Sequence, residues 1–383
     1  MKILHVITTL DVGGAEMHLL AQVRGQSSRG HDVGVAYLKG HGTLSPDFRA
    51  AGAREVTPLG GALSAPLRLR RLMARADLVH THLLKADMLG ALVALLSGRA
   101  KKLVASKHND EQVLKKPLVS RVHGLLGNVP RRTIVLSDHV GRFIEQHGRV
   151  ARGKIRRVYY GLEPAPFVEA SRSSPASKQA TRASFGFDER DVVFTCVARF
   201  APQKAHDVLL KALHRARALP GGERIRLLLV GDDPFGDGRV NAERLARELD
   251  LGAACVFAGI RRDVPAILAA SDVFVMCSLW EGLGLVFLEA MATGLPVLAT
   301  RVSAVPEVVI DGETGVLVPP ADFESLAQAM LALARDPERR VRLGERGRIR
   351  VPAVFGLERM IDETLDVYRE VRGEAPVGAP GRR

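Results

Sequence analysis

The sequence predicts an α/β protein built from two doubly wound domains in tandem. Three observations support this prediction: the length of 383 residues, the alternation of β-rich and helix-periodic segments in both halves, and a polar Ser-, Ala- and Pro-rich stretch between them. One hydrophobic core rarely serves a chain of this length, so two domains are expected. Strands that alternate with helices favour βαβ units and parallel sheets.

The first half opens with a β-rich segment at 2–8, a turn that contains two glycines, and a helix-periodic segment at 17–30. The apolar segment at 83–98 has the length and composition of a buried helix. The other segments of this half are rich in β-branched residues and bounded by turn residues, and we expect strands at 31–38, 77–82, 102–108 and 132–137.

The stretch 169–182 has the composition of a loop or linker, and a second alternating series follows it. Strands are expected where β-branched and apolar residues cluster: 191–200, 224–233, 255–260, 272–278, 296–300 and 315–320. Helices are expected at the periodic segments 207–219, 241–251 and 264–271, after the glycine-spaced turn near residue 283, and from residue 323.

The net charge of +13 is concentrated in the first half of the chain. Residues 1–160 hold 26 Lys and Arg against 11 Asp and Glu, whereas the remainder holds 29 against 31. Such asymmetry indicates either that the first half contacts an anionic partner or that its surface is simply basic and solvated. The longest apolar run, 88–96, is too short to span a bilayer, and the N-terminus lacks a signal-peptide cleavage pattern.

The three cysteines, Cys196, Cys255 and Cys277, stand singly in apolar segments. Their spacing fits neither a disulfide framework nor a metal site, so we expect small core residues in a reducing cytoplasm.

Ligands of an open parallel sheet bind beyond the carboxyl ends of its strands, so the residues that follow each strand are the candidates. Gly13 and Gly14 follow the first strand, where paired glycines admit a close ligand at a helix start, although a plain tight turn explains them as well. His80 and His82 alternate, so both side chains point to one face, and His108 ends a later strand. No third metal ligand is evident beside the first two histidines, and no metal site is predicted.

Two further strand ends carry charged side chains. Arg199 and Lys204 lie between a strand and a helix, where cations can hold a diphosphate and stabilise a departing phosphate. Glu281 follows the strand at 272–278, and the turn Gly282-Leu283-Gly284 presents backbone N–H groups at the start of the next helix.

Glu289 lies on that apolar helix, eight positions after Glu281. A buried carboxylate needs a donor partner, and sugar or ribose hydroxyls or an internal cation would each supply one.

These segments resemble the retaining glycosyltransferases of family 4, which have the GT-B fold of two Rossmann-like domains facing across a cleft. The segment EGLGLVFLEAMATGLPVLAT resembles the family's E-x7-E signature, ARFAPQKAHDVLL its Arg…Lys segment, and TTLDVGGAEMHLL its N-terminal glycine loop. The resemblance extends to about Tyr368. It implies a first domain at 1–165 on the acceptor side, joined by a crossing helix at about 355–372, and a nucleotide-sugar domain at 185–354.

The resemblance also implies a role for each matching residue. Catalytic or charge-stabilising roles fall on four side chains: His108, Arg199, Lys204 and Glu281. Donor contacts, many through the backbone, fall on Gly13, Gly14, Ile260, Gly282, Leu283, Gly284, Leu285 and Glu289. Within this set, Glu289 would hold the ribose hydroxyls and Ile260 would meet the base.

This chain departs from the family pattern at a few positions. Ala198 and Ala205 replace glycines beside the Arg…Lys segment, Leu283 replaces a common Phe, and Tyr160 stands where the family usually has Asn in the motif before the second domain. None of these changes removes a charged group from the implied donor site.

The implied reaction is transfer of a hexose from a UDP- or GDP-sugar to a glycan or lipid-linked acceptor, with retention of anomeric configuration. We expect no cofactor and no metal, because cations and a helix start can meet the charge of the leaving diphosphate and no Asp-x-Asp pair stands in a suitable turn. The alternatives are a GT-B sugar-nucleotide epimerase, a phosphorylase-like enzyme or a basic nucleic-acid-binding protein. With aromatics at 5%, a set of base-stacking side chains is not evident, so no nucleic-acid partner is expected.

The basic first half is consistent with a cytoplasmic enzyme that contacts the anionic inner face of a membrane. The segments PLRLRRLMARAD and KKPLVSRVHGLL could each form an amphipathic surface helix, and ordinary solvated helices are the alternative.

Overall fold

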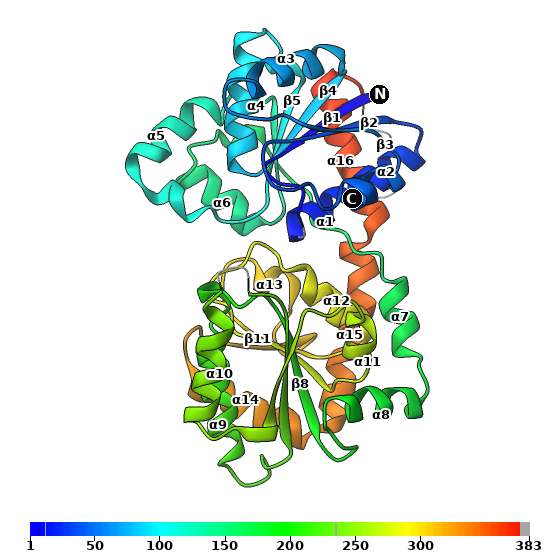
Figure 1. Cartoon of the computed structure of the whole chain (residues 1–383), viewed down its shortest axis with the longest axis vertical. Coiled ribbons are helices and arrows are strands. Elements are labelled where there is room, and N and C mark those ends of the chain that lie inside the picture. The colour runs from blue at the N-terminus through cyan, green and yellow to red at the C-terminus, as the bar shows by residue number, and fades with distance from the viewer. Residues whose placement is uncertain (12, 234–235, 376–383) are drawn as a thin grey trace. The chain divides into compact units, whose positions relative to one another are not determined.

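The computed structural model describes residues 1–11, 13–233 and 236–375. Contacts between residues divide the chain into two units, the first formed by Met1–Gly161 with the returning segment from Leu357, and the second by Leu162–Gly356. In each unit helices cover both faces of a parallel sheet (Figure 1). The fold class is therefore the predicted pair of Rossmann-like α/β domains.

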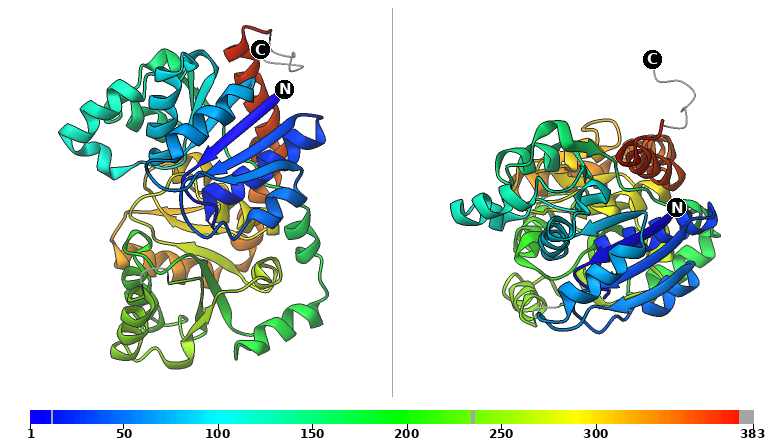
Figure 2. Two further views of the ribbon diagram at one scale, coloured as in Figure 1. Left: turned by 45° about the horizontal axis from the view of Figure 1, so that its top comes forward. Right: turned by 90° about the horizontal axis from the view of Figure 1, so that it is seen from above.

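Among its described residues, the first unit holds a seven-stranded parallel sheet in the order β3-β2-β1-β4-β5-β6-β7. The strands are β1 (Lys2–Ile7), β2 (Asp32–Tyr37), β3 (Ala53–Pro58), β4 (Leu78–His82), β5 (Leu103–Lys107), β6 (Arg132–Val135) and β7 (Ile155–Arg157). The helices are α1 (Gly14–Ser28), α2 (Ser45–Ala50), α3 (Ala65–Arg75), α4 (Leu84–Leu96), α5 (Pro117–Leu126), α6 (Asp138–Gln146) and α16 (Leu357–Arg372). Further views show the same layers (Figure 2).

Alternation along β1 separates the two cores of this unit. Ile3 and Ile7 point to one face and join a core formed with α1, α2 and α16. Leu4 and Val6 point to the other face and join a core formed with α3 and α4. His5 shares the parity of Ile3 and Ile7, so its imidazole lies on the α1 and α16 side of the sheet.

In the described part of the second unit, six parallel strands run in the order β10-β9-β8-β11-β12-β13. They are β8 (Val192–Val197), β9 (Ile225–Val230), β10 (Cys255–Gly259), β11 (Val273–Met276), β12 (Val297–Thr300) and β13 (Gly315–Val318). The helices are α7 (Ala165–Ser171), α8 (Pro175–Ser184), α9 (His206–Arg217), α10 (Gly238–Glu248), α11 (Val264–Ala269), α12 (Leu285–Thr293), α13 (Val305–Val308), α14 (Phe323–Arg335) and α15 (Pro337–Phe355).

The expected linker at 169–182 is helical instead, and that expectation was wrong. All of it except residues 172–174 falls in α7 and α8, both of which belong to the second unit. Ser174 accepts a hydrogen bond from the backbone N–H of Ser177 at 3.2 Å, and Pro175 occupies the first helical position. A capping serine followed by proline starts a helix, and the alanines after it sustain one. Two strands, β3 and β7, were also missed.

The three cysteines are buried and free, as expected. Burial raises the pKa of the Cys196 and Cys255 thiols to about 12, so both are protonated at neutral pH. Among the described helices, none combines the length and the hydropathy required of a bilayer-spanning segment.

Candidate functional site

The site in the second unit follows from the order of its strands. Because β8 and β11 are neighbours in a parallel sheet, the loops that leave their carboxyl ends meet at one edge. The loop after β8 contains Arg199 and Lys204, and the loop after β11 contains Glu281. The sheet therefore brings together charged side chains that are 77 residues apart in sequence.

The two loops are joined by several hydrogen bonds. The backbone N–H of Leu279 donates to the carbonyl of Gln203 at 2.8 Å, and Gln203 Nε2 donates to the carbonyl of Trp280 at 2.6 Å. Cys277 Sγ lies 3.1 Å from the carbonyl oxygen of Ala205. Sequence reasoning assigned no role to Gln203 or Cys277, because their contacts depend on a neighbouring strand rather than on local spacing.

Lys204 and Glu281 form a buried ion pair between Nζ and Oε1. The side chains are 13% and 6% exposed, and Ser278 Oγ donates a further hydrogen bond to Glu281 Oε1 at 2.8 Å. Since a buried carboxylate requires such partners, this contact explains how Glu281 is kept in an otherwise apolar segment. The pair also fixes the positions of a cation and a carboxylate beside the start of α12.

Arg199 has a different environment. Its side chain is exposed, and with the described residues it makes no hydrogen bond or ion pair. Lys204 has its charge balanced by Glu281, so Arg199 supplies the uncompensated positive charge of the β8–α9 loop.

Helix α12 begins beyond a left-handed glycine. Gly284 has φ 81° and caps the helix without a side-chain hydrogen bond, so the first-turn N–H groups receive no side-chain acceptor from their cap. A side chain here would be strained, and its Cβ would lie 2.6 Å from the Phe287 ring. Leu283, next to this glycine, is buried. This helix start can bind an anion.

Glu289 lies one turn inside α12 and is half-buried. Its carboxylate makes no hydrogen bond or ion pair with the residues that the structure describes. Burial raises its pKa to about 7. An internal cationic partner, which the sequence left open, is not found among the described residues.

Ile260 in the second unit and the paired glycines in the first were also expected to contact the donor. Ile260 follows β10 and is 71% exposed. In the first unit, Gly13 caps α1, and a Cβ on it would lie 2.5 Å from Glu16 Oε2. A Cβ on Gly14 would meet nothing within 4 Å, and neither glycine has a positive φ. The space beside Gly14 is therefore open rather than filled by the protein.

His108 follows β5 and is 9% exposed. Its Nδ1 is 2.5 Å from Tyr160 Oη and its Nε2 is 3.1 Å from His82 Nδ1. Both ring nitrogens are thus paired with protein groups. Burial, with a smaller contribution from the Lys107 charge, lowers the pKa of the imidazole to about 3, so the ring is neutral.

The sequence made no third metal ligand evident beside His80 and His82, and the structure places a third histidine there. His5, on the adjacent strand β1, completes a cluster in which one nitrogen of each ring lies within 4.8 Å of the others. The register pairs His5 directly with His80, a relationship that spans 75 residues and has no local signature.

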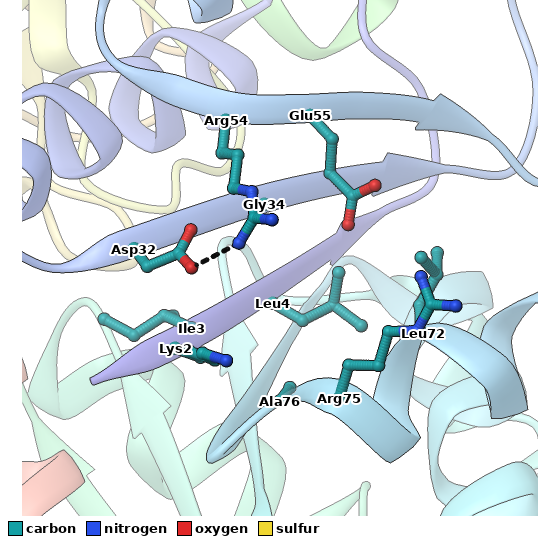
Figure 3. Close-up of a pocket in the computed structure, with 10 residues that line it drawn as sticks. All are labelled: Lys2, Ile3, Leu4, Asp32, Gly34, Arg54, Glu55, Leu72, Arg75 and Ala76. Carbon is teal, nitrogen blue, oxygen red and sulfur yellow. Dashed lines mark hydrogen bonds and ion pairs between the residues drawn. The ribbon is translucent and has the colours of Figure 1, made fainter.

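A pocket elsewhere in the first unit does not share these features (Figure 3). Its volume is about 210 Å³, and it opens where Gly34 lacks a side chain between Leu4 and Glu55 on neighbouring strands. An ion pair of 2.8 Å between Arg54 and Asp32 lies at its side. It lies over the strands and not beyond their carboxyl ends, so it is not the expected place for a ligand of this fold.

Comparison of the sequence with known proteins shows the family to which the chain belongs. Residues 177–350 match the family described as glycosyl transferases group 1, and residues 12–165 match glycosyltransferase family 4. A phosphatidylinositol monomannoside mannosyltransferase of Mycolicibacterium smegmatis, described as GDP-mannose-dependent and alpha-(1-6), is 32% identical over 88% of this chain and 89% of its own. The chain belongs to the family 4, group 1 glycosyltransferases.

A D-inositol 3-phosphate glycosyltransferase of Saccharomonospora viridis is also 32% identical to this glycosyltransferase, over 77% of this chain and 70% of its own. Among solved structures, Anabaena HepE in complex with UDP superimposes with a TM-score of 0.85 at 22% identity, and the match covers 97% of this chain and 100% of HepE. The fold is therefore GT-B, as the motifs implied, and the enzyme is a nucleotide-sugar glycosyltransferase.

Proposed function

We propose that this glycosyltransferase moves a hexose from a UDP- or GDP-sugar to a lipid-linked acceptor, with retention of anomeric configuration and without a metal ion. The observation that carries the proposal is the pairing of Lys204 with Glu281 beside the start of α12, which has no side-chain cap. One turn further on lies the carboxylate of Glu289, which has no partner among the described residues. This arrangement offers a cation and N–H groups to a diphosphate, and carboxylates to sugar and ribose hydroxyls.

Each group has a distinct task in the proposed transfer. Arg199 and the first-turn N–H groups of α12 meet the charge that develops on the departing nucleotide diphosphate. Lys204 contributes a further N–H donor while its pairing with Glu281 fixes where both lie. Glu281 accepts from hydroxyls of the transferred sugar, and Glu289 accepts from the ribose. These cationic and dipolar groups do the work that a divalent metal does in other transferases.

The comparisons support this choice of donor and acceptor classes. The Mycolicibacterium smegmatis relative is described as GDP-mannose-dependent and as acting on a phosphatidylinositol mannoside, and HepE was crystallised with UDP. Sugar transfer is common to the descriptions of both relatives, and an inositol-containing acceptor is named in both.

The donor is tested by thermal shift with UDP, GDP, UDP-glucose and GDP-mannose. A ligand that binds only the folded state raises stability by about 2.7 kcal/mol at a concentration 100 times its Kd. We expect one nucleotide class to raise the Tm of the wild type and to raise that of Glu289→Gln by less at the same concentration. No shift with any of these nucleotides would contradict the proposal.

Retention and metal independence have their own measurements. NMR of the isolated product should show the anomeric configuration of the donor, and an inverted product would exclude the proposed stereochemistry. Activity should be unchanged by EDTA and by added Mg²⁺. A loss of activity in EDTA that Mg²⁺ restores would exclude metal independence.

We also propose that α5 of the first unit docks on anionic lipid. Leu118, Val122 and Leu125 have the spacing of one helix face and are 73%, 46% and 78% exposed. Lys115, Lys116 and Arg121 are exposed on or next to the same helix. A helix with exposed leucines and flanking cations has the composition of an interfacial membrane-binding segment.

Vesicle flotation tests this contact. We expect the enzyme to float at low salt with vesicles that contain phosphatidylglycerol and to stay at the bottom with phosphatidylcholine alone. Equal flotation with both would remove the electrostatic part of the proposal, and no flotation with either would remove the docking surface.

A further inference from the structure

A network of buried histidines lies behind His108 in the first unit. His5 on β1 and His80 on β4 are direct register partners, and His82 lies two positions further along β4 on the same face. The three rings are fully buried, with centroids 4.1 to 5.3 Å apart. This cluster has no role in the donor site, so it needs a separate explanation.

A continuous chain of hydrogen bonds passes through these rings. It begins with the 2.5 Å contact between Tyr160 Oη and His108 Nδ1, and continues over 3.1 Å from His108 Nε2 to His82 Nδ1. His82 Nε2 is 2.9 Å from His5 Nδ1, and His5 Nε2 is 2.8 Å from Gln26 Oε1. Each imidazole is therefore bonded at both nitrogens, and the chain ends on an amide.

A metal ion would compete with these bonds. His5, His80 and His82 could in principle offer one nitrogen each, but all their nitrogens are already paired. His80 Nδ1 is 2.6 Å from Tyr368 Oη, and His80 Nε2 is 2.7 Å from Ser106 Oγ. The separation of 2.9 Å between His5 Nδ1 and His82 Nε2 fits an N–H···N hydrogen bond, whereas two nitrogens on one zinc at about 2.0–2.1 Å each stand further apart. The geometry favours a hydrogen-bond chain over a metal site.

The amide of Gln26 gives the chain its direction. As oriented, Gln26 Nε2 donates to Gln22 Oε1 and to Tyr368 Oη, both at 3.3 Å, so that its carbonyl faces His5. A carbonyl only accepts, so His5 must carry its proton on Nε2 and accept on Nδ1. Burial lowers the pKa of His5 to about 4, which keeps the ring neutral with a single N–H.

The remaining protons follow from this one. His82 donates from Nε2 to His5 and accepts on Nδ1, and His108 in turn donates from Nε2 to His82. His108 Nδ1 is then left as an acceptor, and Tyr160 donates its hydroxyl proton to it. Burial, with repulsion among the histidines, also lowers the pKa of His82. The state of one amide thus specifies three imidazole tautomers.

We propose that Gln26 is a positioning residue that fixes the tautomer of His108 through the directed chain Tyr160→His108→His82→His5→Gln26. The proposal rests on the proposed function and deepens it, because it assigns the neutral Nε2–H form to His108, the imidazole to which the family resemblance gives a catalytic role. The same amide directs a second branch, in which Tyr368 donates to His80 Nδ1 and His80 Nε2 donates to Ser106.

The histidine network also contacts the two segments of the polypeptide that belong to the first unit, the one that ends at Gly161 and the one that returns at Leu357. Tyr160 lies one residue before the end of the first segment, and its ring stacks on His18 at 4.0 Å. Tyr368 lies on α16, the returning helix, and is fully buried. If the hydrogen-bond chain reversed its direction, the hydroxyl groups of Tyr160 and Tyr368, one on each segment, would therefore change their hydrogen-bonding roles.

The tautomers can be measured in the wild-type enzyme without reference to activity. Two-bond ¹H–¹⁵N correlation spectra of ¹⁵N-histidine-labelled protein distinguish Nε2–H from Nδ1–H, and His108→Gln identifies the His108 signals. We expect His5, His82 and His108 all as neutral Nε2–H forms from pH 6 to pH 8. Finding His108 as Nδ1–H, or finding one equivalent of tightly bound zinc by elemental analysis, would overturn the proposal.

Gln26→Glu tests the direction. A carboxylate at this position stabilises protonated His5, which then donates from Nδ1 and turns His82 and His108 into Nδ1–H forms. Ser106→Ala is the matched control, because it removes only the acceptor of His80 and should leave His108 as Nε2–H. If Gln26→Glu folds and His108 keeps its wild-type tautomer, residue 26 does not set the tautomer of His108 and the proposal is wrong.

A kinetic measurement then links the chain to catalysis. We expect Gln26→Glu to lower kcat at least about ten-fold with little change in the donor KM, within the range up to about 10⁴ that a wrong histidine tautomer costs in other enzymes. If the tautomer of His108 reverses and kcat is unchanged, Gln26 does set the tautomer but the tautomer does not matter for sugar transfer. The two statements can therefore fail separately.

Discussion

Lys204 Nζ and Glu281 Oε1 are in direct contact, and the two residues reach each other from loops that follow adjacent parallel strands. The pair has two consequences. It holds a cation and a carboxylate at the start of α12, where the proposed donor binds. It also couples the site to the stability of the second unit, because each charge is buried against the other.

Breaking this pair should therefore destabilise the fold as well as the activity. We expect Lys204→Met to lower the free energy of unfolding by about 3–5 kcal/mol, because it leaves the Glu281 carboxylate buried without its cation. In the double variant Lys204→Met/Glu281→Gln, the loss of unfolding free energy should be smaller than the sum of the two single losses by at least about 1 kcal/mol. Urea unfolding of the four proteins measures the coupling.

An exposed pair provides the control for this cycle. Lys211 and Asp207 lie 3.6 Å apart on α9 with side chains 45% and 59% exposed. Lys211→Met should change the free energy of unfolding by no more than about 0.5 kcal/mol. Strictly additive effects at Lys204 and Glu281 would show that the buried contact contributes nothing.

Glu289 should make the stability of the second unit depend on pH. Its folded-state pKa of about 7 is higher than the unfolded value, so the folded state retains the proton over a range in which the unfolded state has lost it. The unfolded state then binds fewer protons, and stability falls as pH rises from about 4.5 to 7 and is level above. The loss is no more than about 3.5 kcal/mol, the value that a shift from 4.5 to about 7 implies.

Glu289→Gln should remove this dependence. We expect the variant to match the wild type near pH 5 and to be more stable at pH 8, while it binds the nucleotide more weakly, because an amide meets the same burial without ionising. Chemical denaturation at pH 5, 6, 7 and 8 provides the comparison. A variant that is less stable than the wild type at pH 8 would mean that the carboxylate has a stabilising partner.

Most of the fold could be predicted from the sequence because the two-residue alternation of strands and the 3.6-residue period of helices are both local patterns. The alternation in DLVHTH placed His80 and His82 on one face, and contacts in the structure agree. His5 joined them only because β1 and β4 are adjacent, and strand order is not written in local spacing. The contact of Lys204 with Glu281 depends in the same way on β8 and β11 being neighbours.

The errors have equally specific causes. The segment with Ser174 and Pro175 was predicted as a linker because serine and proline are common in loops, yet in this order they cap and start a helix. At Ala205, where the family often has glycine, the structure shows φ 47°, so the left-handed conformation is kept without the residue that favours it. The resemblance implied that the loops after β8 and β11 bind the donor, but it gave no indication of the bonds through Gln203 and Cys277 that join them.

Gly231 should be required for the shape of the donor loops. A Cβ at this position would lie 1.9 Å from the carbonyl oxygen of Ala198, the residue that precedes Arg199. We expect Gly231→Ala to lower the free energy of unfolding by about 3 kcal/mol and to weaken nucleotide binding, because the Ala198–Arg199 backbone must move. Gly153→Ala is the control, since its Cβ meets nothing within 4 Å, and a change within about 0.5 kcal/mol is expected. Equal stability of the two variants would show that the loop yields freely.

The proposed membrane contact should depend on the exposed leucines of α5. Leu118→Asp/Leu125→Asp replaces two side chains that are 73% and 78% exposed, so folding should be little affected. Each leucine contributes up to about 1.5–3 kcal/mol when it is buried in lipid, so we expect at least a ten-fold loss of binding to vesicles that contain phosphatidylglycerol. The matched control is Val240→Asp/Ile349→Asp in the second unit, at 60% and 70% exposure, which makes the same change in charge without altering α5. Both double variants add two negative charges, so a general electrostatic effect would weaken the vesicle binding of both equally. That outcome would reject α5 as the docking surface.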